Sequence, residues 1–287
     1  MTERFAETAQ RLESLRQLDA VVTAMRGIAA SRAQHAHGLL PGIRAYASVI
    51  GHAIGQALAL APAADHGPSR AARRTAVVLF GAEQGFAGAF SDRVLAALDG
   101  APQPFDLFLI GTRGAMFAGE RHVKPAWHAA MVPHASLVTT LAGRIAEALY
   151  AWLSDHGAQR VDVIVPTWSS ASGVLATRRA LLPFDFRRFA VPVCGQAPLI
   201  TLPPRLLLAR LAEEYVFAEL CDAALTAFAA ENEARVAAML AAKSNLETMQ
   251  SEVQSLARQL RQEEITAEVV ELASGAGART RAPGTAP

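Results

Sequence analysis

The sequence predicts an α/β fold in which the N- and C-terminal helices form a long antiparallel coiled coil around an inserted α/β domain. Three observations support this prediction. The first 60 residues follow a helical apolar pattern. Short apolar strands alternate with helices over residues 75–201. A stretch without Pro or Gly then runs over residues 205–273, which is longer than a globular core of this size requires.

The N-terminal helix is expected over residues 1–60, because no helix-breaking residue occurs before Gly38 and the Pro41-Gly42 pair. Its apolar positions recur at steps of three or four residues, which indicates one buried stripe. These positions are Leu12, Leu15, Leu18, Val22, Met25 and Ala29. Residues 61–74 gather Pro, Gly, Asp and Ser, which is typical of a linker.

The middle of the chain, residues 75–201, changes period. The runs "TAVVLF", "FDLFLIG" and "RVDVIVP" are short, apolar and rich in β-branched or aromatic residues, so each predicts a strand. Helical stretches such as "SLVTTLAGRIAEALYAWLSDHG" lie between them. This alternation predicts a Rossmann-like domain with a largely parallel sheet, to which "GVLATRRALLPF" adds one more strand.

The C-terminal helix is expected over residues 205–273, since Pro203 and Pro204 suit a helix start. Its apolar residues step by 3, 4, 3 and 4, which predicts a coiled-coil seam. The seam residues are Leu246, Met249, Val253, Leu256 and Leu260. The N-terminal helix is the natural partner, and residues 274–287 are expected to form a flexible tail.

Composition excludes several classes of function. The 27 Lys and Arg nearly balance the 26 Asp and Glu, so the net charge of +1 does not favour nucleic acid. Cys194 and Cys221 are the only cysteines, which excludes a disulfide framework or a cysteine zinc site. The longest apolar runs are too short to span a bilayer, so no direct membrane insertion is expected. The N-terminus lacks a signal-peptide pattern, which indicates a cytosolic start.

The candidate chemical motifs give no catalytic, cofactor-binding or metal-binding residues. The glycines of "GAEQGFAGAF" lie at 81, 85 and 88, a spacing that fits neither common phosphate-binding fingerprint, so a tight strand-to-helix turn is the preferred interpretation. His35 and His37 lie on different faces of a helix, and no ligand-spaced acid accompanies the loop histidines 122, 128 and 134. The serines of "PTWSSASG" lack a nucleophile elbow.

The two terminal helices resemble those of the γ subunit of F-type ATP synthases, the central rotor shaft. "RLESLRQLDAVVTAMRGIAASR" is similar to the family's N-terminal helix, with matches that include Met25 and Arg32. "ENEARVAAMLAAKSNLE" and "RQEEITAEVVELASGAGA" are similar to its C-terminal motifs, and "EQGFAGAF" to its glycine turn. Gly27, Lys243 and Glu263-Glu264 depart from the family pattern, which suggests a divergent bacterial member.

The resemblance implies a function and its partners. The chain would transmit rotation between a membrane ion-driven ring and a catalytic hexamer of α and β subunits, with the ε subunit beside it and the chemistry in β. Met25, Arg261, Gln262 and Thr266 are the residues that would contact β. The resemblance also implies a peripheral membrane protein on the cytoplasmic face of the bacterial inner membrane, without a cofactor.

Two other interpretations remain open. One is a Rossmann-like nucleotide-binding enzyme with helical arms, which ligand-induced stabilisation by nucleotides would favour. The other is a plain coiled-coil tether, which would purify alone, without α and β subunits.

Overall fold

The computed structural model describes residues 2–60, 74–156, 160–189 and 198–279. The chain divides into two compact units. One unit comprises Ile28–Ala238, and the other combines Met1–Gly27 with Met239–Pro287. We refer to them as the α/β unit and the helical-end unit. The predicted linker at 61–74 lies, except for Arg74, outside the described residues.

Two long helices, α1 (Thr2–Leu60) and α5 (Pro204–Arg279), contribute to both units. Helix α1 continues through Pro41, because the surrounding residues pack against the α/β core and outweigh one missing N–H. Helix α5 extends past the predicted end at residue 273. Residues 274–279 of the predicted flexible tail are therefore helical, and residues 280–287 lie outside the described residues. Gly275 and Gly277 only weaken a helix, and the next Pro in the sequence is Pro283.

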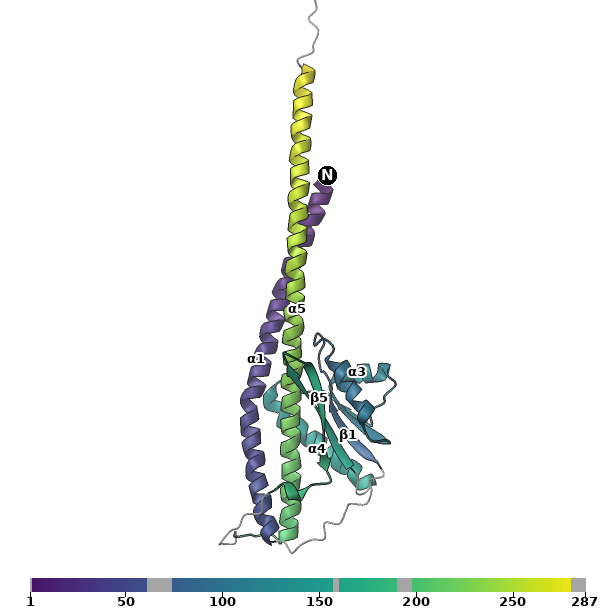
Figure 1. Ribbon diagram of the computed structural model, residues 1–287, viewed down its shortest axis with the longest axis vertical. Helices are drawn as coiled ribbons and strands as arrows, with labels where there is room; N and C mark the ends of the chain where they lie inside the picture. The colour runs from purple at the N-terminus through teal and green to yellow at the C-terminus, as the bar shows by residue number, and fades with distance from the viewer. Residues whose placement is uncertain (1, 61–73, 157–159, 190–197, 280–287) are drawn as a thin grey trace, which may run out of the picture. The chain divides into compact units, whose positions relative to one another are not determined.

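The two helices pair antiparallel in each unit, as predicted (Figure 1). In the helical-end unit, Gln250 Nε2 donates to the Leu15 carbonyl at 3.2 Å, and Lys243 pairs with Asp19. In the α/β unit the cross-helix contacts are His37–Glu233, Arg44–Asp222 and Tyr46–Glu214, with distances of 2.8, 2.9 and 2.8 Å. In each unit the α1 number rises as the α5 number falls, which defines the antiparallel direction.

The buried stripe of α1 does not follow the predicted residues throughout. Leu15 and Ala29 are buried and Leu12, Val22 and Met25 are half-buried, but Leu18 is 52% exposed. The stripe instead passes through Asp19 and Arg26, which are half-buried. The apolar pattern predicted that Leu18 would be buried. In the structure the residues buried or half-buried between Thr8 and Leu40 follow one another at alternating steps of four and three, and this spacing places Asp19 in the stripe.

The predicted seam on α5 is correct at three positions and wrong at two. Val253 is buried, and Leu246 and Leu260 are half-buried. Met249 and Leu256 are 39% and 45% exposed, and their places are taken by the half-buried Gln250 and Ala257. The heptad period is right, but the stripe is displaced by one residue at alternate positions.

The α/β unit contains a five-stranded sheet in the order β3-β2-β1-β4-β5. Strand β1 runs parallel to β2 and β4, β3 runs parallel to β2, and β5 is antiparallel to β4. The strands are β1 (Thr75–Phe80), β2 (Phe105–Ile110), β3 (Trp127–Ala129), β4 (Arg160–Ser169) and β5 (Gly173–Leu182). The largely parallel sheet was predicted; the short β3 was missed, because three residues carry no readable period.

Helices cover both faces of the sheet, which explains why every residue of β1 is buried. Ala76, Val78 and Phe80 pack with α4, α1 and α5 in one core cluster. Val77 and Leu79 pack with α2, α3 and part of α5 in the other. The covering helices are α2 (Phe90–Ala96), α3 (Thr112–Glu120) and α4 (Val138–His156). Short 3₁₀ helices complete the unit: η1 (Ala97–Gly100), η2 (Ala135–Leu137) and η3 (Phe186–Arg188).

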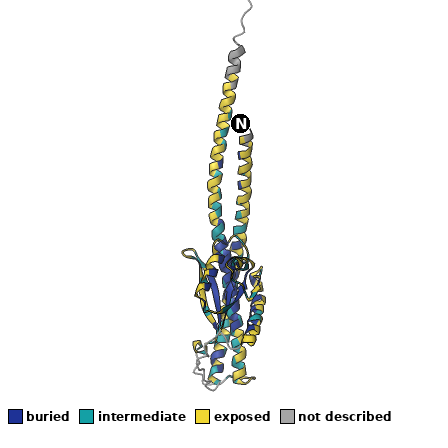
Figure 2. Cartoon of the chain, turned by 90° about the vertical axis from the view of Figure 1, so that its right-hand side faces the viewer, coloured by how far each residue is buried: buried dark blue, intermediate teal, exposed yellow. Residues whose placement is uncertain are grey.

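The burial pattern differs between the two units (Figure 2). In the α/β unit, α5 is largely buried from Leu220 to Ala230. In the helical-end unit, α5 has Met239 and Val253 as its only buried residues among those described. None of the described helices is both long and apolar enough to cross a membrane.

Candidate functional site

Large apolar side chains are exposed on both helices of the helical-end unit. Leu18 and Val21 on α1 are 52% and 54% exposed. On α5 the exposed set is Leu240, Met249, Leu256, Ile265, Val269, Val270 and Leu272, with exposures between 39% and 75%. Exposed large apolar side chains are candidates for contact with another protein. We call these nine residues the apolar outer surface.

The four residues predicted to contact a partner all belong to the helical-end unit. Met25 is half-buried on α1, while Arg261, Gln262 and Thr266 are exposed on α5. Gln262 and Thr266 share one helix face, because Thr266 Oγ1 donates to the Gln262 carbonyl at 2.8 Å. The exposed side chains of Arg261, Gln262 and Thr266 are accessible to a partner. Contact of these three residues and of Met25 with β remains a prediction.

The β1–α2 loop, residues 81–89, is attached to α5 by a buried ion pair. The Glu231 carboxylate accepts the backbone N–H groups of Glu83 and Gln84 at 3.0 and 3.1 Å. Arg235 donates to the carbonyls of Gly85 and Gln84 at 3.1 and 3.3 Å, and to Glu231 at 2.5 Å. The side chains of Glu231 and Arg235 are only 5% and 6% exposed. Burying an ion pair costs desolvation free energy, and further hydrogen bonds to both charged groups offset this cost here.

Asn232 completes this pair from within α5. Its amide nitrogen donates to the Phe228 carbonyl at 2.8 Å, and its amide oxygen accepts from Arg235 Nη1 at 3.1 Å. The guanidinium is therefore bonded on three sides, which holds it in one orientation.

Glu83 extends the network from the loop to the sheet edge. Its carboxylate accepts the Thr112 N–H and hydroxyl at 2.9 and 2.8 Å, and the Met131 N–H at 2.8 Å. Thr112 is the first residue of α3, where a carboxylate is favoured by the helix dipole. The loop, α3 and the segment after β3 are thus linked through one side chain.

This network explains why the glycine turn is a poor phosphate site. The loop follows the central strand β1, where α/β folds usually bind a nucleotide phosphate. Here the N–H groups of Glu83 and Gln84 are occupied by Glu231, and the N-terminus of α3 is occupied by Glu83. The predicted tight turn is confirmed at Gly81, where an added Cβ would lie 2.9 Å from Gly114 Cα, and at Gly88, with φ of 58°.

Sequence reasoning did not identify this network. Glu231 and Arg235 lie in the segment "ENEARVAAMLAAKSNLE", whose resemblance to a family motif does not reveal a contact with Glu83. One signal was present, since an acid and an arginine four residues apart share a helix face. Their buried position, however, follows from the packing of α5 on the loop.

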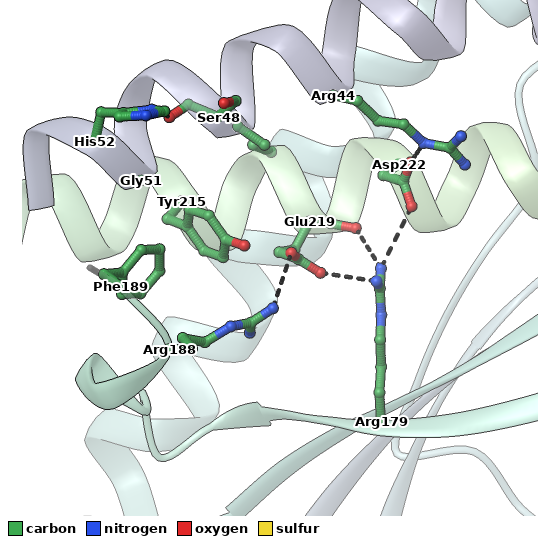
Figure 3. A pocket seen from close by; sticks show the side chains of 12 residues that line it. Arg44, Ser48, Gly51, His52, Arg179, Arg188, Phe189, Tyr215, Glu219 and Asp222 are labelled. Atoms are coloured by element: carbon green, nitrogen blue, oxygen red, sulfur yellow. Dashed lines mark hydrogen bonds and ion pairs between the residues drawn. The ribbon is translucent and has the colours of Figure 1, made fainter. Parts of the chain in front are cut away.

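A pocket of about 540 Å³ lies between α1, α5 and the segment around η3 in the α/β unit (Figure 3). Arg179 of β5 pairs with Glu219 at 2.9 Å and with Asp222 at 3.7 Å, and Arg44 of α1 pairs with Asp222. Arg188 lies over the Tyr215 ring, 5.4 Å from its centroid. The arginines are one-third to two-thirds exposed, so solvent screens these pairs more than the Glu231–Arg235 pair.

The remaining candidate motifs have structural surroundings of their own. His35, His122, His128 and His134 are exposed, and His37 contacts Glu233. No cluster of three metal-ligating side chains occurs among the described residues. Ser169 and Ser172 hydrogen-bond to each other at 2.6 Å in the β4–β5 turn, which makes the serine-rich stretch a polar hairpin turn.

Two buried groups of the α/β unit have shifted pKa values. Burial raises the pKa of the Cys221 thiol to about 12. At Asp106, burial alone would raise the pKa, but hydrogen bonds from Arg74 and Trp152 together with the charge of Arg74 lower it below its usual value. Cys221 is fully buried, and the Asp106 side chain is 12% exposed.

The long paired helices and the inserted sheet have counterparts in known proteins. A family model described as ATP synthase matches residues 4–278. The chain belongs to the ATP synthase gamma family. Within this family it is 27% identical to the ATP synthase gamma chain of Streptomyces avermitilis, in an alignment that covers 94% of each chain. It is 29% identical to that of Beutenbergia cavernae, over 94% of this chain and 96% of the relative.

Solved ATP synthase structures have the same fold. A chain of the Euglena gracilis mitochondrial ATP synthase, in a structure of OSCP, F1 and c-ring, matches with a TM-score of 0.68 and 11% identity, over 100% of this chain and 99% of that chain. A chain from the central stalk and c-ring of the Tetrahymena thermophila enzyme matches with a TM-score of 0.57 and 15% identity, over 77% and 99%. The gamma-family architecture of paired terminal helices around an α/β domain is therefore present here.

Proposed function

We propose that this gamma-family chain is the central stalk of an F-type ATP synthase. It transmits rotation between a membrane ion-driven ring and a catalytic hexamer of α and β subunits, for ATP synthesis or hydrolysis. The observation that carries the proposal is the apolar outer surface of the helical-end unit, whose exposed large side chains suit contact with a surrounding partner. Family membership over residues 4–278 identifies the kind of partner.

The surface suits a rotor that turns within a sleeve. Two paired helices provide stiffness along their length. Many outward residues are apolar or small, and charged and amide side chains lie among them. Apolar contact has no preferred direction, so the apolar part of this surface would not hold the rotor at one angle. A limited number of polar groups can then couple rotation to the conformation of the surrounding subunits.

Arg261, Gln262 and Thr266 are the proposed coupling groups. The exposed side chains of Arg261 and Gln262 offer donors to acidic or carbonyl groups of a β subunit. The Thr266 hydroxyl donates to the Gln262 carbonyl, so it is proposed to accept a hydrogen bond from β. Met25 of α1 is proposed to lie close to β, where an added charge would be costly.

The other partners follow from the same assignment. The α/β unit is proposed to contact the membrane ring and the ε subunit, since similar chains occur in structures described as OSCP/F1/c-ring and as central stalk with c-ring. The protein would then be peripheral on the cytoplasmic face of the bacterial inner membrane. Catalysis would belong to β, and this chain would need no cofactor.

A Rossmann-like enzyme is not favoured. The N–H groups that would receive a phosphate are bonded to Glu231 and Glu83, so a nucleotide would have to displace two carboxylates. Nucleotide-induced stabilisation of the isolated chain would support that alternative.

Copurification tests the proposal. A tagged chain expressed in its own host is expected to bring down α and β subunits and ATP hydrolysis activity. Membrane vesicles from a strain lacking the chain are expected to lose ATP-driven membrane potential, and a plasmid copy should restore it. A chain that purifies alone, with full potential in the deletion strain, would contradict the central-stalk function.

A further inference from the structure

The contact between α5 and the β1–α2 loop combines small apolar groups with a directional polar network. Ala230 and Ala234 of α5 pack into the core cluster on the α2–α3 side of the sheet. Methyl groups interdigitate little, and apolar contact has no preferred direction. The charged groups of Glu231 and Arg235, in contrast, hold three successive loop residues by hydrogen bonds of defined geometry.

The polar contacts continue beyond the loop. Glu231 binds the N–H of Glu83, and the side chain of the same Glu83 binds Thr112 and Met131. A rotation of α5 about its axis would therefore pull on the loop, on the start of α3 and on the segment after β3 together. No comparable chain of buried charges joins α5 to the sheet elsewhere in the described part of the α/β unit, since the Arg179–Glu219 pair is more exposed.

We propose that Glu231 and Glu83 form a two-step carboxylate link through which α5 and the α/β domain turn as one body. Glu231, Arg235 and Glu83 are positioning residues for coupling. The inference rests on the proposed central-stalk function, because only a rotor would need to transmit torque from this domain into α5.

The experiment uses the complete complex in membrane vesicles. The variants are Glu231→Gln, which puts an amide against two N–H donors, and Glu83→Gln, which keeps the Glu231–Arg235 pair. The control is Glu233→Gln, the same change on the same helix at a side chain that contacts His37 of α1. Complex yield, ATP hydrolysis rate and membrane potential per ATP hydrolysed are measured for each, with hydrogen exchange of the purified complex.

Glu231→Gln is expected to speed hydrogen exchange at the Glu83 and Gln84 amides, and Glu83→Gln at the Thr112 and Met131 amides. Both are expected to lower the membrane potential per ATP severalfold in complexes that assemble and hydrolyse ATP. Glu233→Gln should leave both measurements unchanged. A purely structural role would lower the yield of complex without changing the potential per ATP.

Normal potential per ATP in both glutamate variants, despite faster exchange, would overturn the link. If Glu231→Gln prevents assembly, Glu83→Gln decides the question by the same measurement. Failure of the unmodified chain to enter a complex with α and β would instead contradict the central-stalk function, so the two failures are distinguishable.

Discussion

Lys243 on α5 and Asp19 on α1 form an ion pair across the two terminal helices, with Nζ 3.7 Å from Oδ1. Both side chains are about two-thirds buried, at 30% and 32% exposure. Lys243 is one of the positions that depart from the family pattern, and Asp19 lies in the buried stripe where a hydrophobic residue was expected. Lys243 therefore supplies a counter-charge to Asp19 across the interface, and Asp19 Oδ1 is buried without a hydrogen bond in the described part of the chain.

Replacing Lys243 by Thr is expected to destabilise the chain by about 1 kcal/mol, because the half-buried Asp19 loses its partner. In an Asp19→Asn background the same change should cost less, with a coupling energy of about 0.5–1 kcal/mol. Urea unfolding of the four proteins measures both values. Equal effects of Lys243→Thr in the two backgrounds would show that the pair contributes nothing.

Gly27→Ala is expected to stabilise α1. An added Cβ would meet no atom within 4 Å, so close approach of a neighbouring helix does not explain this glycine. In open space, alanine gains about 1 kcal/mol over glycine in a helix. The midpoint of urea unfolding should rise, whereas Gly81→Ala should lower it through the backbone contact with Gly114.

Acid should destabilise the α/β unit through Asp106. Arg74 and Trp152 hydrogen-bond to this carboxylate, at 2.7 and 2.9 Å, and hold its pKa below the usual value. A lowered folded-state pKa contributes stability above the unfolded-state pKa of about 4, and that stability is lost as the pH falls through the folded value. Urea midpoints between pH 7 and the acid limit should therefore fall less steeply for Asp106→Asn than for the unmodified chain.

The control for this measurement is Asp99→Asn, which alters an exposed acid in the same unit. Its midpoints should follow those of the unmodified chain at every pH. Parallel acid profiles for the Asp106 variant and the unmodified chain would refute the role given to Asp106.

Cys221 should not react with Ellman's reagent at pH 8 in the folded chain. Its side chain is fully buried, and burial raises the thiol pKa to about 12, so the reactive thiolate is scarce. A Cys194→Ser background isolates the signal. Full reaction is expected only in denaturant, while a cysteine introduced at the exposed Met116 should react at once. Rapid reaction of native Cys221 would mean that this part of α5 opens readily.

The double change Arg261→Ala and Gln262→Ala is expected to lower coupled ATP synthesis more than the amount of assembled complex, because it removes donors proposed to engage β. Arg258→Ala with Gln259→Ala is a matched control, since it removes the same residue types one turn earlier, also from exposed positions. Synthesis rates in membrane vesicles, normalised to complex content, separate the two. Equal rates for the two double variants would rule out a specific coupling role.

Much of the architecture could be predicted because it depends on local patterns. The helical period of residues 1–60, the Pro- and Gly-free stretch from Arg205, and the apolar runs that form β1, β2 and β4 are each readable within a few turns of chain. The family resemblance was readable for the same reason, since its motifs lie in continuous segments. These features determined the α/β fold and the central-stalk assignment.

The tertiary structure decided which residues face each other. Leu18 and Asp19 are neighbours in sequence, and only the packing of α5 places Asp19 rather than Leu18 in the interface. Glu83 and Glu231 lie far apart in sequence, yet the Glu231 carboxylate accepts the Glu83 N–H, which is then not free to bind a phosphate. A local pattern specifies the period of a helix, but the register of two helices and the partners of a buried charge depend on contacts between distant segments.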